Sequence, residues 1–184
     1  MTEKIKKEIE SMTTDEMKQR LAEYMAADQQ LASRPVAVEV RISSINNIRC
    51  RYDVLLVAEN GQETVVNFPD RYSRLLYIFT LLHPQGYQRY TASADNYKIL
   101  RQLYSMLYFK DGNALLRTVE STDPNHFFSH YIAQSRKAIR QATSHASFII
   151  DRPQSHNGKV LIPFVAEGGK VILDKTLRNL MSHL

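Results

Sequence analysis

The dipeptide Asn60-Gly61 separates two strand-like runs, and it restricts the fold of this chain more than any other local feature. Residues 49–59 before it and residues 64–68 after it are rich in apolar and β-branched side chains. Because Asn-Gly readily adopts the left-handed backbone of a tight hairpin turn, we expect the two runs to pair as antiparallel strands. Residues 36–42 alternate apolar and polar side chains, which is the period of a half-buried strand. The sequence therefore predicts an antiparallel β-meander.

Helical patterns dominate the chain after this meander. Four segments show apolar residues at helical spacing. They begin at residue types that favour helix starts, such as Asp70 at a cap position or Pro124 in a first turn. The predicted helices cover residues 70–82, 93–111, 113–120 (a short turn) and 124–144.

Strand-like patterns return near the C-terminus. Residues 148–150 and 160–162 flank a polar loop and are predicted to pair as a hairpin. Residues 171–173 form a further short strand, and Asp174 is expected to cap a closing helix. The predicted fold class is α+β, with an N-terminal helical extension over residues 1–34 and a single domain over residues 35–184.

Basic charge is concentrated in one part of the chain. The formal net charge is +5, and residues 70–164 alone hold 12 basic and 6 acidic side chains. A segment of this kind suits a polyanionic partner, because each phosphate that is neutralised releases counterions. A mildly basic surface without such a partner is the alternative interpretation of the same charge.

Three features of the sequence indicate the cellular compartment of the protein. Cys50 is the single cysteine, so no intramolecular disulfide is expected. The first 21 residues are charged every two or three positions, unlike a signal peptide. The longest apolar stretch, around residues 75–82, is too short to span a bilayer. We expect a soluble, cytoplasmic protein without membrane contact.

The predicted 124–144 helix has two chemically different faces. No carboxylate occurs between Phe127 and Ile150. Arg, Lys and Gln side chains bind guanine edges, phosphates and adenine in the major groove, so this helix is a candidate recognition helix. An ordinary amphipathic surface helix is the alternative. The expected core face holds Phe127, Phe128, Tyr131, Ile132, Ser135, Ala138, Ile139 and Ala142, and the opposite face holds Ser129, His130, Arg136, Lys137 and Arg140, flanked by Gln134 and Gln141.

The polar loop that follows this helix is a second candidate contact. Residues 151–159 lie between the two predicted strands of the C-terminal hairpin, where a loop can reach a phosphate or enter a minor groove. A polar tip is also common to surface hairpins that bind nothing. The candidate contact residues are Arg152, His156, Asn157 and Lys159.

The order of these elements resembles the winged helix-turn-helix effector domain of OmpR/PhoB-type response regulators. The resembling stretches are the hairpin RYDVLLVAENGQETVVNF, the helix DRYSRLLYIFTLLHPQG, and the helix with its wing, HFFSHYIAQSRKAIRQATSHASFIIDRPQSHNGKVLIPF. The resemblance covers about residues 50–165. It departs from the family pattern at Gly158-Lys159-Val160, where the family wing usually ends in Gly-x-Gly-Tyr. It implies a three-helix body with a C-terminal β-hairpin wing.

The function that this resemblance implies is sequence-specific binding of double-stranded DNA, as in a transcriptional regulator. The 124–144 helix would be the recognition helix and the 151–159 loop the wing. The alternative is a winged-helix type module that binds protein or acts as a scaffold, because a fold alone does not determine function.

Other chemistries leave no signature in the sequence. His126 and His130 are spaced i, i+4, as in some zinc sites, but no third ligand is apparent. Glycine-rich phosphate loops and the Gly-x-Ser-x-Gly nucleophile elbow are absent. We therefore expect no enzymatic activity, no metal and no cofactor.

The N-terminal helical segment is predicted to take part in self-association. Its apolar residues fall roughly on one stripe within charged flanks, which is typical of a helix at a modest interface. We expect a homodimer in which residues 2–32 contribute contact area, unless the stripe packs on the sheet of its own chain. The stripe consists of Met17, Leu21, Tyr24, Met25 and Leu31.

Overall fold

The structure is a computed structural model of the chain, and it describes residues 14–32, 37–44, 52–88, 94–108, 112–151 and 158–181. The chain divides into two compact units, Met1–Arg34 and Pro35–Leu184. In the first unit, helix α2 (Thr14–Ala32) confirms the predicted helix over those residues. Within the described ranges, no helix combines the length and apolar character needed to cross a bilayer.

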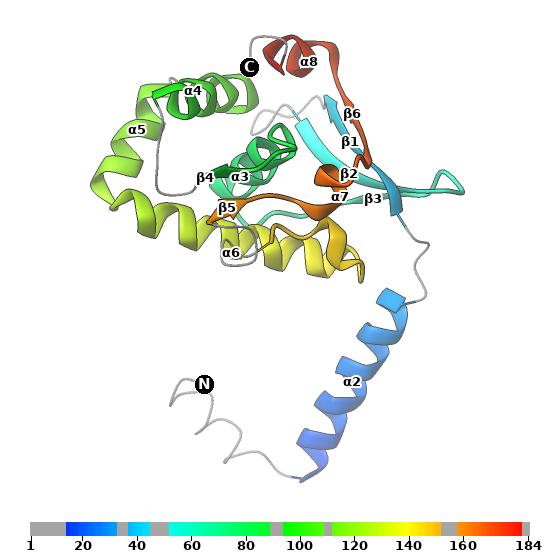
Figure 1. The fold of residues 1–184 in the computed structure, drawn as a ribbon. Coiled ribbons are helices and arrows are strands. Elements are labelled where there is room, and N and C mark those ends of the chain that lie inside the picture. Colours follow the sequence, from blue (N-terminus) through cyan, green and yellow to red (C-terminus); the bar gives the residue numbers. More distant parts are fainter. Residues whose placement is uncertain are drawn as a thin grey trace. The chain divides into compact units, whose positions relative to one another are not determined.

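A four-stranded sheet forms one side of the second unit (Figure 1). The order of its strands is β3-β2-β1-β6. β1, β2 and β3 pair antiparallel, which confirms the predicted meander. β6 pairs with β1 in parallel, so the sheet is mixed, a pairing that the sequence did not predict. The strands are β1 (Ala37–Ser44), β2 (Tyr52–Ala58), β3 (Glu63–Val65) and β6 (Lys170–Leu173).

The predicted hairpin at Asn60-Gly61 is present, but its loop is one residue longer than expected. Ala58 N–H donates to the Gln62 carbonyl (2.9 Å), and Gly61 N–H donates to the Ala58 carbonyl (2.9 Å). Gly61 has φ +82°, the left-handed conformation that glycine adopts without a steric penalty. This is a three-residue loop with glycine in its last position, the next commonest hairpin connection after the two-residue turn.

Ion pairs across the sheet attach β6 to β1. The nearly buried Glu39 carboxylate on β1 contacts Lys170 Nζ on β6 (2.5 Å) and Arg41 Nη2 (2.9 Å). Arg41 also pairs with Glu63 on β3. The hydrogen bond from Lys170 lowers the pKa of Glu39 below its ordinary value of 4.5, although burial acts in the opposite direction. Charged groups on three strands therefore contribute to holding the C-terminal strand on the sheet.

Because of this network, we expect the free energy of unfolding to fall at acid pH. Because the folded protein lowers the pKa of Glu39, the contribution is present above pH 4.5 and is lost as pH falls through the lower, folded-state pKa. We expect Glu39→Gln to flatten the fall in unfolding free energy between neutral pH and about pH 3. Urea unfolding at a series of pH values measures this, with Lys175→Gln as a control on an exposed side chain. An unchanged pH profile in the Glu39→Gln variant would contradict the assignment.

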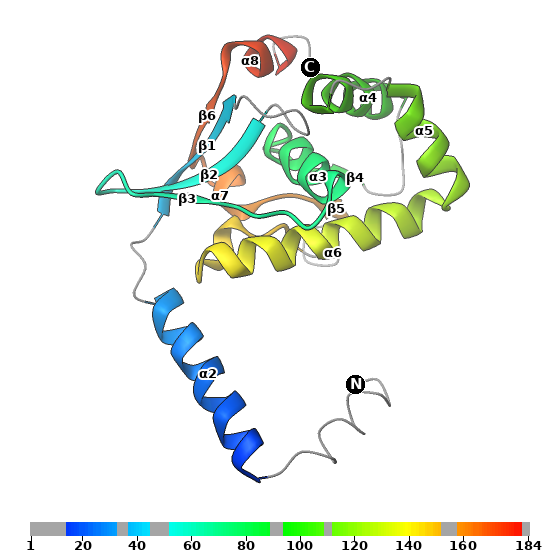
Figure 2. The same cartoon turned by 180° about the vertical axis from the view of Figure 1, so that it is seen from behind.

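Helix α3 (Arg71–Leu81) forms the centre of the second unit. Figures 1 and 2 show it with the sheet on one side, α4 (Ala94–Tyr108) and α5 (Gly112–Ser121) on the other, and α6 (Pro124–Ala142) running beneath it. The Asp70 carboxylate accepts the N–H groups of Tyr72 and Ser73 (both 2.8 Å), as the sequence predicted for a capping residue. Nine of the eleven residues of α3 are buried, so the helix contacts neighbours on nearly all sides.

The predicted C-terminal wing hairpin is wrong in its pairing. Residues 146–148 form a short 3-10 helix, η1, instead of a strand. Phe148 and Ile150 are buried in the core, and the Phe148 carbonyl accepts the Tyr77 hydroxyl (3.0 Å). Asp151 N–H still donates to the Leu161 carbonyl (2.8 Å), but residues 148–150 form no strand. β5 (Lys159–Val160) pairs instead with β4 (Tyr87–Gln88), which follows α3.

The remaining helices also differ in part from expectation. α5 is a full ten-residue helix and not a short turn, because Leu115 and Val119 are buried in the core. The body therefore has four helices from α3 to α6, where three were predicted. The four-residue α7 (Pro163–Ala166) was not predicted. The predicted closing helix is confirmed as α8 (Lys175–Met181), capped by Asp174.

Candidate functional site

Helix α6 confirms the predicted helix from Pro124 to Ala142, two residues short of the predicted end, and it confirms the predicted buried face except at Tyr131, which is half-buried. It begins after Asp123, whose carboxylate accepts His126 N–H (3.2 Å), and it ends at Thr143. Ser135 lies at the contact with α3, where its hydroxyl donates to the Ser73 carbonyl (2.6 Å). This hydrogen bond and the apolar packing fix the rotation of α6 about its own axis. The buried residues are Phe127, Phe128, Ile132, Ser135, Ala138, Ile139 and Ala142.

The face of α6 away from α3 carries the candidate contact residues. Lys137 and Arg140 are exposed, as are Ser129 and His130. The Ser129 hydroxyl donates within the helix to the Asn125 carbonyl (2.7 Å), so its oxygen remains an acceptor. The exposed residues that follow the helical repeat along this face are His126, His130, Ala133, Lys137 and Arg140.

Gln134 flanks the exposed face as the sequence predicted, whereas Arg136 is more buried than predicted. Gln134 and Arg136 are half-buried, at the borders between the exposed face and the core face. For Arg136 the expectation of an exposed side chain is therefore wrong. Long basic side chains commonly lay their methylene groups along apolar surface, which explains how Arg136 occupies such a border.

The electrostatic character of this face comes from an absence of acidic side chains on the helix. All 19 residues of α6 lack carboxylates. The nearest acidic residues along the chain are exposed Glu120 and Asp123, before the helix, and half-buried Asp151, after it. The stripe between them therefore presents positive charge to solvent, with no acidic neighbour on the same helix to neutralise it.

The strand that carries Lys159 lies next to this helix. β5 runs beside α6 in both views (Figures 1 and 2). Lys159 is exposed, and its Nζ lies 3.4 Å from the Gln85 carbonyl oxygen. The other three candidates of the 151–159 loop, Arg152, His156 and Asn157, lie outside the described residues.

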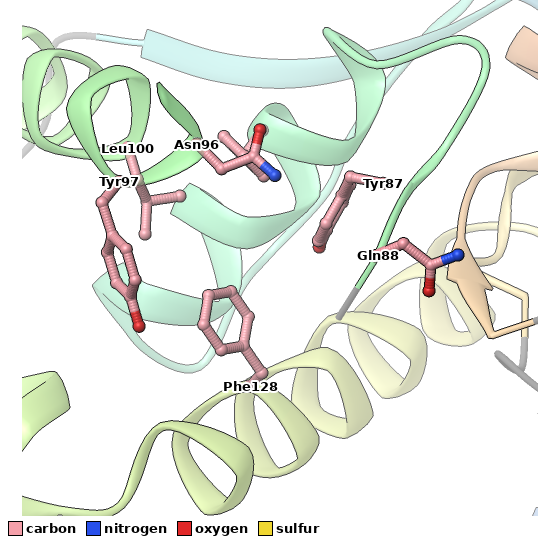
Figure 3. Close-up of a pocket in the computed structure, with 7 residues that line it drawn as sticks. Tyr87, Gln88, Asn96, Tyr97, Leu100 and Phe128 are labelled. Carbon is pink, nitrogen blue, oxygen red and sulfur yellow. The ribbon is translucent and has the colours of Figure 1, made fainter. Parts of the chain in front are cut away.

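A small pocket between α3, β4, α4 and α6 was not foreseen from the sequence. Figure 3 shows Phe128 rising from α6 toward Tyr97 and Leu100 of α4, with Tyr87 and Gln88 opposite. The space among these residues, including solvent at its mouth, is about 260 Å³. The lining residues are Phe79, Tyr87, Gln88, Asn96, Tyr97, Leu100 and Phe128.

The residues that line this pocket are suited to apolar packing and not to proton transfer. Four aromatic rings line it, and neither a carboxylate nor a histidine is among its lining residues. Burial raises the pKa of the Tyr97 hydroxyl, and the negative charge of Glu120 raises it further, so the phenol is neutral at pH 7. Aromatic residues at helical spacing were the only sequence signal of the pocket, and they equally indicate an ordinary core.

The histidine pair on α6 forms a ring stack. The rings of His126 and His130 lie 6.1 Å apart with an interplanar angle of 20°. In the part of the chain that the structure describes, no three His, Cys, Asp or Glu side chains are grouped in a way that would hold a metal ion.

The fold and this surface define an α+β protein that presents a carboxylate-free, basic helix to solvent. Comparison of the chain with protein-family models, with curated proteins and with solved structures gave no match.

Proposed function

We propose that this chain binds double-stranded DNA through the exposed face of α6 and acts as a sequence-specific regulator of transcription. The observation that carries the proposal is the exposed stripe of α6, with Lys137 and Arg140 on a helix without any carboxylate. Lys and Arg on such a helix contact phosphates and guanine edges, and the shape of a helix suits the major groove.

The connection between α5 and α6 supports the same proposal. Only Thr122 and Asp123 separate the two helices, so α6 follows α5 after a short turn, as the second helix does in a helix-turn-helix. In such proteins the second helix enters the major groove with its N-terminal residues at base edges. His126, Ser129 and His130 occupy that half of α6, and we propose base contacts for them. Lys137 and Arg140 would then lie near phosphates.

The loop over residues 151–159 provides a second proposed contact. Lys159 lies on β5, next to α6, and adds a positive charge from another element of the fold (Figure 2). A backbone contact of this kind increases affinity without selecting a sequence.

Duplex binding by a double variant tests the proposal. We expect the wild-type protein to bind duplex DNA at low salt, with an affinity that falls steeply as salt rises. Lys137→Ala with Arg140→Ala should weaken binding about tenfold or more and lower the slope of log K against log salt by roughly 1–2. Fluorescence anisotropy of a labelled duplex across 50–200 mM salt measures both quantities.

A matched control removes the same charge elsewhere. Lys98→Ala with Lys175→Ala deletes two exposed lysines on α4 and α8, and binding should change by less than about threefold. Equal losses in the two double variants would show a dependence on net charge alone, and α6 would not be the binding surface. Undetectable binding by the wild-type protein at 50 mM salt would refute DNA binding altogether.

A second candidate function is protein binding by the same fold, as a scaffold or assembly module. The exposed apolar side chains of α2 favour it, because large apolar groups in water are a common feature of protein interfaces. A wild-type protein that fails to bind duplex DNA at low salt would leave this function as the better supported one.

A further inference from the structure

Exposed apolar side chains are concentrated on α2. Of the five large hydrophobic residues that are exposed in the described part of the chain, four lie on this helix, and the fifth is Val65. The exposed fractions are 43% for Met17, 60% for Leu21, 74% for Tyr24 and 56% for Met25. Most of the stability of helices in proteins comes from packing of an apolar face, so burial of this surface against a partner would stabilise α2.

The spacing of these residues is symmetric about Leu21. Met17 precedes Leu21 by four residues and Met25 follows it by four, so the three form one i, i+4, i+8 ridge. Ridges of this type pack into each other at a crossing angle of about −50°, the commonest class of helix contact. A ridge with the order Met-Leu-Met reads the same in both directions, and therefore matches a second copy of itself in antiparallel orientation.

We propose that α2 is a homodimer interface, in which two copies of the helix cross antiparallel at Leu21. In this arrangement the two Leu21 side chains meet on the two-fold axis, and Met17 of each copy packs against Met25 of the other. Such a contact is isologous, with the same patch used on both copies. This proposal goes beyond DNA binding and does not depend on it.

The available area predicts a weak dimer. Burial of the four side chains on both copies would remove roughly 1,000 Å² from water, near the lower limit for a specific interface. We therefore expect dissociation at micromolar concentrations rather than an obligate dimer. If the chain also binds DNA, dimerisation would supply two copies of α6 to one duplex and raise the apparent affinity.

Sedimentation of full-length variants tests the interface. The wild-type protein should change from monomer to dimer between about 1 and 200 μM. Leu21→Glu places two carboxylates on the two-fold axis and should raise the dissociation constant at least tenfold. Ala26→Glu introduces the same charge at an exposed position away from the stripe and should leave it within about twofold. A monomeric wild-type protein at 200 μM, or equal dimerisation by Leu21→Glu, would overturn the proposal.

Disulfide trapping tests the antiparallel geometry, and it does not require a disruptive charge. In a Cys50→Ser background, Leu21→Cys should form an intermolecular disulfide on mild oxidation, because the two residues meet at the crossing point. Met17→Cys should not, since its two copies would lie far apart along the helices. Efficient trapping of Met17→Cys would indicate a parallel pair, and failure of Leu21→Cys would exclude the crossing at Leu21.

Discussion

Replacing Phe127 by alanine is expected to lower the free energy of unfolding by about 3–5 kcal/mol. Phe127 has no exposed surface, and its ring lies 5.3 Å from the Tyr72 ring of α3 and 4.8 Å from the Tyr131 ring, both in edge-to-face contact. The substitution removes apolar burial and these ring contacts together, and it leaves a cavity between α3 and α6. Urea unfolding followed by circular dichroism measures the loss.

The control for this prediction lies on the opposite face of the same helix. Lys137→Ala removes a long side chain from an exposed position and should change the unfolding free energy by less than about 0.5 kcal/mol. The DNA-binding test uses Lys137→Ala together with Arg140→Ala, and that double variant should also unfold within about 0.5 kcal/mol of the wild type if its loss of binding is local. If Phe127→Ala cost less than about 1 kcal/mol, α6 would not be anchored through this ring.

Replacing Gly169 by alanine is expected to destabilise the protein by about 2–3 kcal/mol. A Cβ atom at this position would meet the Phe164 carbonyl oxygen and, at 2.6 Å, two carbons of the Phe164 ring. The backbone here is also fixed by a hydrogen bond from Gly169 N–H to the Phe164 carbonyl (2.8 Å). The clash involves backbone on both sides, so either α7 or the start of β6 must move.

The neighbouring glycine provides a matched control. Gly168 has φ +84°, and no atom lies within 4 Å of a Cβ built there. Asparagine tolerates this left-handed conformation, so Gly168→Asn should cost less than about 1 kcal/mol. Hydrogen exchange would localise the effect of Gly169→Ala, with faster exchange expected in β6 than in β2. Equal stability of the two variants would contradict the steric explanation.

The sequence predicted which side chains of α6 are exposed. It did not predict how far neighbouring elements cover the helix. The positions of Ser129, His130, Lys137 and Arg140 on the exposed face followed from the helical period of their apolar neighbours. The half-buried position of Arg136 did not, because the width of the buried face depends on what packs beside the helix.

The aromatic pocket shows the same limit more strongly. Its lining comes from four elements, with Phe79 on α3, Tyr87 on β4, Leu100 on α4 and Phe128 on α6. Each of these residues is an ordinary core residue by its local pattern. Only their convergence makes a pocket, and convergence is a property of helix packing angles that no local pattern contains.

Local features were determined by the sequence itself. Asp70 and Asp174 cap helices, Gly61 takes the left-handed position of a hairpin loop, and Pro124 lies in the first turn of α6. Each depends on hydrogen bonds or steric limits among residues a few positions apart, so the amino-acid types suffice to predict it.

Pairings across the chain were decided by the tertiary structure. Residues 171–173 look like a strand from their own composition, but their parallel partner β1 lies about 130 residues earlier, and Glu39 and Lys170 meet only because the fold brings them together. Residues 148–150 also have the composition of a strand. In the fold, however, the Tyr77 hydroxyl donates to the Phe148 carbonyl, and the Phe148 side chain is buried in the core. An apolar pattern predicts that a segment will be buried. Its position in the fold depends on which distant segments compete for the same hydrogen bonds and core volume.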